Sequence, residues 1–134
     1  MFFEELEGFD QKKSVYNFAY NASTPELEEW LSTQVRACRT GGAAINPLPH
    51  EDQVKLTCTS FGPGNCEDAI DRQIDNLLAQ ESGWLIFNTH GLDGEGWGPI
   101  RSTYLDRLLE RLLAIDSVDI LPVGQALDKY VAPA

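Results

Sequence analysis

The residue best suited to chemistry is His90, which stands where an apolar segment gives way to a glycine-rich one. Residues 84–87 are strand-favouring and apolar, and Asn88-Thr89-His90 then turns polar. Residues 91–98 contain four glycines and Trp97. An imidazole has an ordinary pKa of about 6.5, so it can exchange protons near neutral pH. Because active sites gather at strand ends, the segment predicts a titratable imidazole at a candidate active site; a histidine that only caps the strand is the alternative.

Two further side chains are candidates for contact with a ligand. Arg39 follows an expected strand at residues 35–38, where it would orient a carboxylate or a substrate oxygen; a surface ion pair is the alternative. Trp97 stands near Asp93 and Glu95 and would stack on a sugar ring, or else anchor its own loop by packing. One histidine with loop carboxylates falls short of a zinc ligand set, so we expect no metal ligand in this chain alone.

The elements that must position these residues alternate between strands and amphipathic helices. Strands are expected at residues 14–20, 35–38, 54–59, 84–90 and 118–123. Helices are expected after Thr24-Pro25, after Gly62-Pro63-Gly64, and at residues 103–115 and 125–131. Because parallel strands need crossover connections, the alternation predicts one α/β domain over residues 1–134, with a mainly parallel sheet. It fits either an open sheet or part of a barrel.

Some side chains are expected to serve the fold alone. Asp71 and Asp75 lie four positions apart and should form the solvated helix face opposite Ile70 and Ile74. Trp30 and Trp84 should belong to the core.

Composition narrows the partners and the compartment. The net charge of −11 argues against nucleic acid, because phosphate binding needs clustered Lys and Arg. No segment approaches the roughly 20 apolar residues of a membrane helix, so no membrane partner is expected. The start lacks the features of a secretion signal, and the three cysteines fit no common zinc pattern, which predicts a cytoplasmic protein with reduced thiols.

The order of several short motifs resembles that of the polysaccharide deacetylases, the NodB-homology or carbohydrate esterase family 4. Asn17-Phe18-Ala19-Tyr20-Asn21 is similar to a strand end of that family, and Val35-Arg36-Ala37-Cys38-Arg39-Thr40-Gly41-Gly42 resembles the strand and loop that follow. The segment from Gly83 to Gly91 resembles the last family motif, which ends in a histidine, and residues 118–127 resemble the closing strand and helix.

The resemblance implies a partial (β/α) barrel, equivalent to the carboxyl-terminal half of a deacetylase domain. By this resemblance His90 is the general acid, Arg39 an orienting residue, and Trp97 and Tyr20 contact the substrate. The complete family hydrolyses acetamido C–N bonds on carbohydrate with a divalent metal such as zinc. Its Asp-Asp motif and paired histidines have no counterpart here, because His50 and His90 are the only histidines.

Two functions follow as hypotheses. The first is a deacetylase-like domain that needs another polypeptide to supply the metal half. The second is a non-catalytic carbohydrate-binding or interaction module. Since a barrel fragment leaves open sheet edges, which tend to pair, we also expect a homodimer or a complementary partner.

Overall fold

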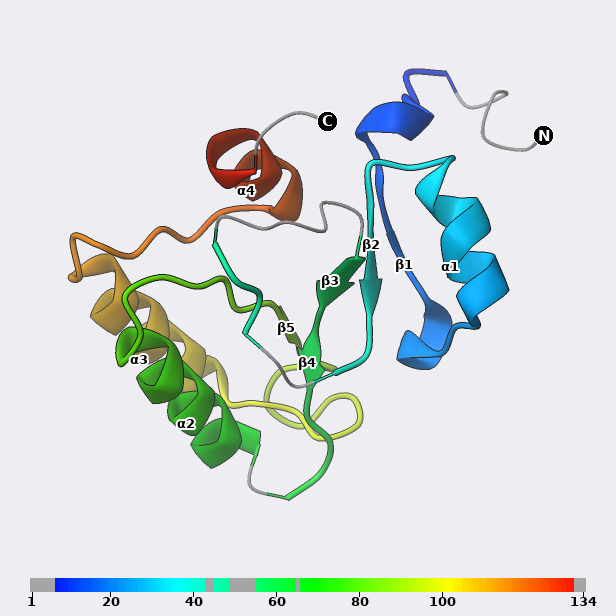
Figure 1. Ribbon diagram of the computed structural model, residues 1–134. Coiled ribbons are helices and arrows are strands. Elements are labelled where there is room, and N and C mark those ends of the chain that lie inside the picture. Colours follow the sequence, from blue (N-terminus) through cyan, green and yellow to red (C-terminus); the bar gives the residue numbers. More distant parts are fainter. Residues whose placement is uncertain (1–6, 43–44, 49–54, 65, 132–134) are drawn as a thin grey trace.

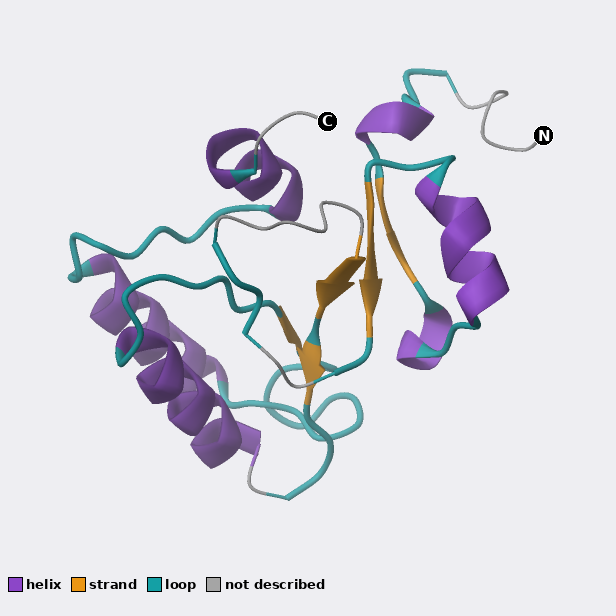
Figure 2. Cartoon of the chain, viewed as in Figure 1, coloured by secondary structure: helices purple, strands orange, loops and turns teal. Residues whose placement is uncertain are grey.

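The computed structural model describes residues 7–42, 45–48, 55–64 and 66–131 (Figure 1). Short strands alternate with helices along the chain (Figure 2). The strands are β1 (Val15–Asn17), β2 (Ala37–Thr40), β3 (Lys55–Thr57), β4 (Thr59–Ser60) and β5 (Phe87–Asn88). The α-helices are α1 (Pro25–Ser32), α2 (Cys66–Leu78), α3 (Ser102–Leu113) and α4 (Val123–Tyr130), and the 3₁₀ turns are η1 (Gln11–Lys13) and η2 (Ala19–Asn21).

All described strand pairs are parallel, as expected from the alternation of strands and helices. β1, β2 and β3 form one sheet in that order, and β4 and β5 form a second. Only Cys58 separates β3 from β4, so the two sheets continue into each other and strand order follows chain order. Within the described ranges the sheets do not close into a barrel. The chain is therefore a mixed α/β protein with short parallel strands.

Helices cover both faces of the β1–β3 sheet. Leu31 of α1 packs with Phe18, Val35 and Cys38, whereas the neighbouring Ala37 belongs to the core cluster that includes Leu127 of α4. Successive strand residues point to opposite faces. α1 and α4 therefore lie on opposite sides of β2.

The start of α1 matches its sequence signature. The Thr24 hydroxyl accepts a hydrogen bond from the Leu27 N–H at 3.3 Å, and Pro25 occupies the first turn. A capping side chain satisfies one of the amide groups that the first turn leaves unpaired. Trp30, expected in the core, is 44% exposed, because the short helix directs Leu31 toward β2 instead. Trp84 is partly buried against the core.

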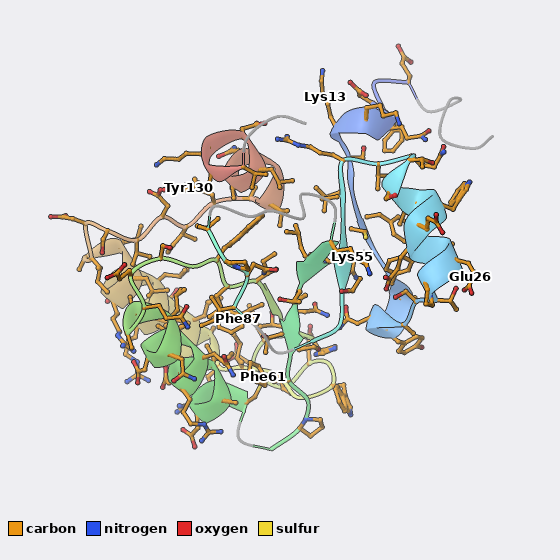
Figure 3. The ribbon with its side chains drawn as sticks, in the orientation of Figure 1. Lys13, Glu26, Lys55, Phe61, Phe87 and Tyr130 are labelled. Carbon is orange, nitrogen blue, oxygen red and sulfur yellow. The ribbon has the colours of Figure 1, made fainter. Side chains whose placement is uncertain are left out.

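α2 and α3 lie side by side and share a core (Figure 1). Its buried members are Cys66, Ile70, Ile74, Ile100, Tyr104 and Leu108. Phe61 and Phe87 pack against it from the strand side with ring centroids 6.2 Å apart, and Figure 3 shows both rings between the strands and α2. The helix pair thus supports the segments that follow β4 and β5.

The two aspartates of α2 were expected on a solvated face, and the Asp75 side chain is 64% exposed whereas Asp71 is half-buried. Asp71 accepts a hydrogen bond from the Tyr104 hydroxyl at 2.9 Å, and Asp75 pairs with Arg111 at 2.6 Å. Both carboxylates therefore tie α2 to α3. Burial, helped by Asp71, raises the pKa of the Tyr104 phenol, so it stays a donor.

The expected strand at residues 118–123 is absent: residues 118–122 form no strand, and α4 begins at Val123. Asp119 instead accepts a hydrogen bond from Lys129 at 2.6 Å and another from the Tyr130 hydroxyl. The segment is thus held against α4 rather than in a sheet.

Among the helices of the described chain, none is both long enough and apolar enough to span a membrane.

Candidate functional site

The segments that follow the strands lie at one edge of the sheets because the strands are parallel. η2 follows β1, Gly41 follows β2, residues 61–64 follow β4 and residues 89–100 follow β5. These segments share one end of the molecule (Figure 1). In open α/β sheets, ligands bind outside the carboxyl ends of the strands.

The loop that carries His90 and Trp97 is closed on itself by backbone hydrogen bonds. Leu92 and Ile100 form a parallel bridge, in which the Asp93 N–H donates to the Ile100 carbonyl at 2.8 Å. The Asp93 carboxylate accepts from the Ser102 N–H at 2.9 Å, at the first residue of α3. Asp93 therefore fixes the loop to a helix, a role that the sequence analysis did not assign to it.

Two glycines permit the tight path of this loop. Gly96 has φ +87°, and a Cβ built there would lie 2.0 Å from the His90 carbonyl oxygen. Gly98 has φ +68°, and its Cβ would lie 2.4 Å from the Gly62 carbonyl carbon. Only glycine tolerates both the left-handed backbone and the missing space. The loop after β5 thus rests directly on the loop after β4.

Trp97 is both exposed and firmly seated. Its ring lies on Gly62, where a Cβ would approach the indole Cη2 to 2.2 Å. The His90 ring stands nearly perpendicular to it, at 88° and 5.2 Å between centroids. Trp97 nonetheless remains 61% exposed. The structure therefore brings together two of the four candidate site residues, on a seat supplied by Gly62.

Arg39 lies on β2, away from this aromatic pair. Its Nη1 donates to the Cys58 Sγ at 3.6 Å, and none of the ion pairs between described residues includes it. Burial raises the pKa of the Cys58 thiol, and the Arg39 guanidinium opposes that rise in part. Arg39 and Cys58 are thus held together as a polar contact at the sheet, and no hydrogen bond between described residues joins Arg39 to His90.

Tyr20 lies in η2, at the end of β1. It is fully exposed, with φ 55°, and Asn21 follows with φ 52°. Two successive left-handed residues turn the chain sharply after the strand, which projects the Tyr20 ring into solvent. No ring contact between described residues connects it with Trp97.

The described residues around His90 do not form a metal site. The His90 ring contacts an indole, and the Asp93 carboxylate is already engaged with Ser102. No group of three or more His, Cys, Asp or Glu side chains in the described ranges is arranged to hold a metal ion. His50, the other histidine, lies outside these ranges.

Sequence reasoning missed Gly62 and the polar strand ends. In the sequence, Gly62-Pro63-Gly64 indicates a helix start, and α2 does begin shortly after it, at Cys66. The contact of Gly62 with Trp97 was not foreseen. Ser60 and Asn88 are neighbours in the β4–β5 register, and they stand two positions before Gly62 and His90 in the chain. The sequence did contain a signal for these residues. Parallel strands bring their carboxyl ends together, so residues that follow different strands are expected to lie at one edge of the sheet.

No family model, curated protein or solved structure matches this chain.

Proposed function

We propose that this chain is a deacetylase-like carbohydrate-binding domain, built as a partial (β/α) barrel, that binds a sugar ring on Trp97 without hydrolysing it alone. One observation carries the proposal. Trp97 is 61% exposed, yet its ring is fixed by Gly62 and His90. Because the ring is held in one orientation, its free face offers an apolar surface on which a ligand ring can stack without further ordering of the side chain.

The chemistry of a sugar suits this surface. A pyranose ring presents a face of C–H bonds, whose partial positive charge is attracted by the negative face of an indole. Its hydroxyl and acetamido groups need hydrogen-bond partners at the rim. Ser60 at the end of β4, and Thr89 and Glu95 in the loop after β5, are exposed side chains that would supply donors and acceptors to such groups.

The site is organised before a ligand arrives. Backbone hydrogen bonds and the Asp93 cap fix the loop, so binding would order few additional groups. Affinity rises when a site does not lose further conformational freedom on binding. In a binding domain, His90 would contact the sugar with the edge of its ring. If a partner polypeptide supplied the metal-binding half of a deacetylase, the His90 imidazole would protonate the leaving amine.

Titration with N-acetylglucosamine oligomers, followed by isothermal calorimetry, tests the proposal. The wild-type chain is expected to bind, and Trp97→Ala to weaken binding by about tenfold or more (about 1.4 kcal/mol), because the variant loses the apolar surface that the face of the sugar would cover. Trp30→Ala is the matched control, because Trp30 is a 44% exposed indole on α1. It should bind as the wild type does.

Two results would overturn the proposal. One is the absence of binding to any acetylated or deacetylated oligomer at millimolar concentration. The other is an equal loss of affinity in the Trp97→Ala and Trp30→Ala variants. Acetate release by the isolated chain would instead show that catalysis needs no partner.

A further inference from the structure

The two segments that hold the Trp97 ring contain no Lys or Arg. They are residues 59–64 and residues 87–100, which meet where the indole lies on its glycine seat. The next cation along the chain, Arg101, is already engaged, because its Nε donates to the Glu67 carboxylate at 3.0 Å and the two side chains form an ion pair. An anionic ligand therefore finds no Lys or Arg partner within these segments.

Glu95 stands close enough to Trp97 for its charge to act on a ligand there. Its side chain is exposed, and two peptide units separate the Cα atoms of the two residues, which limits their distance to about 7 Å. The Glu95 carbonyl oxygen lies against Gly91, where a Cβ would approach it to 2.0 Å, so the closed loop holds Glu95 beside the residue that follows His90. Exposed charges act over about 8–10 Å at moderate salt. The two residues thus lie within one Debye length.

The indole and the carboxylates favour a ligand that carries a positive charge. An indole face attracts a cation more strongly than the other aromatic side chains do. Asp93 adds a second carboxylate to the same loop, where it accepts hydrogen bonds from Ser102. The chain as a whole has a net charge of −11, which attracts cations. Among sugars, the form suited to this surface is an amino sugar whose amine is free and protonated.

We propose that the Trp97 surface selects amino sugars with a free, protonated amine over N-acetylated ones. This inference rests on the proposed function, because it assigns the charge of the sugar that binds there. The ammonium group would lie at the border of the indole, between the ring and Glu95. An acetamido group carries no charge, so it would gain neither the cation–π contact nor the ion pair. The apolar face of the sugar would contribute equally in both cases.

Calorimetric titration with glucosamine and N-acetylglucosamine oligomers of equal length tests this preference. At low ionic strength and neutral pH, the glucosamine oligomer should bind about tenfold more tightly. This expectation follows because a cation–π contact and an exposed ion pair each strengthen binding by about two- to fivefold. The difference should shrink as salt is added, since salt screens exposed charges.

Substitution of Glu95 separates its local charge from the net charge of the chain. Glu95→Gln should weaken binding of the glucosamine oligomer by about threefold and leave that of the N-acetylglucosamine oligomer unchanged. Glu29→Gln is the matched control, because Glu29 is an exposed carboxylate on α1 and its substitution changes the net charge by the same amount. It should bind both oligomers as the wild type does. Trp97→Ala should weaken binding of both.

The outcomes distinguish this inference from the proposed function. Equal affinity for the two oligomers, reduced for both in Trp97→Ala, would overturn the inference and leave the proposed function intact. Binding of the glucosamine oligomer that survives Trp97→Ala, or that falls equally in Glu95→Gln and Glu29→Gln, would also overturn it. A diffuse attraction to the acidic chain would then explain the binding. Failure of both oligomers to bind would overturn the proposed function and this inference together.

Discussion

At the scale of single residues, the seat of Trp97 depends on the absence of a side chain at Gly62. A Cβ there would lie 2.2 Å from the indole, so Gly62→Ala must displace the ring. We expect the displaced indole to show altered fluorescence and oligosaccharide binding to fall toward that of Trp97→Ala. Gly94→Ala is the control, because nothing lies within 4 Å of its Cβ position. Unchanged binding by Gly62→Ala would show that the orientation of Trp97 is unimportant.

The candidate residues differ in how far the sequence could place them. His90 was expected at a strand end, and it follows β5 closely. The expected neighbourhood of Trp97 included Asp93 and Glu95, but the Asp93 carboxylate caps α3 instead. The contact with Gly62 joins segments far apart in the chain, and no local pattern reports such a contact. A role at a strand end can therefore be predicted from type and position, whereas a contact between two loops cannot.

At the scale of elements, the Asn46 side chain forms hydrogen bonds with the backbone of β3, as a neighbouring strand would. It is 2% exposed, its Oδ1 accepts from the Thr57 N–H at 2.9 Å, and its Nδ2 donates to the Thr57 carbonyl at 3.0 Å. Its backbone also exchanges two hydrogen bonds of 2.8 Å with Trp84. One side chain thus joins β3 to the segment that leads into β5.

We expect Asn46→Ala to lower the free energy of unfolding by about 1–3 kcal/mol, since buried polar groups then lose their partners. Urea denaturation measures the change. Asn76→Ala, on the exposed face of α2, should stay within about 0.5 kcal/mol of the wild type. Similar losses in both variants would mean that the Asn46 side chain does not join the two segments.

The pairing of α2 with α3 should depend on pH through Glu67. Its carboxylate accepts from the Arg101 N–H at 2.8 Å and from the guanidinium Nε at 3.0 Å, and this contact with Arg101 holds the pKa of Glu67 below its usual range. A lowered pKa in the folded state stabilises the fold above the pKa of the unfolded chain. That stabilisation is lost as the pH falls through the folded-state pKa.

The free energy of unfolding should therefore decrease below about pH 4.5, and the decrease should be shallower in Glu67→Gln. Chemical denaturation at a series of pH values from neutral to acid measures both slopes. Glu110→Gln, on the exposed face of α3, should keep the slope of the wild type. Identical slopes in wild type and Glu67→Gln would refute the role of this ion pair.

The helices were easier to predict than the strands. α1 and α2 begin where capping and proline or glycine signals indicated, because those signals act within one turn. The apolar residues at 118–123 were interpreted as a strand, yet Asp119 binds the end of α4. A short apolar run has no periodicity of its own, so its partner decides its conformation. The length of a strand is also hard to predict from its residue types. A strand was expected at residues 84–90, but only Phe87–Asn88 pair as β5.

At the scale of the whole molecule, the parallel arrangement followed from the alternation of elements, but the extent of the sheet did not. The connections between parallel strands require helices or long loops, which the sequence displays. Whether successive strands close into a barrel depends on their tilt and stagger, which arise from packing across the whole sheet. The described strands are short and leave β1 at an edge.

The agreement between strand order and chain order has a consequence for synthesis on the ribosome. Each new strand emerges after its only preceding neighbour, so the sheet can grow by addition at one edge and no strand must later insert between two others. Among the described strands β1 emerges first, and no later described strand pairs with its outer edge. On a messenger that carries several ribosomes, nascent chains would therefore present this same edge to one another before any of them is complete.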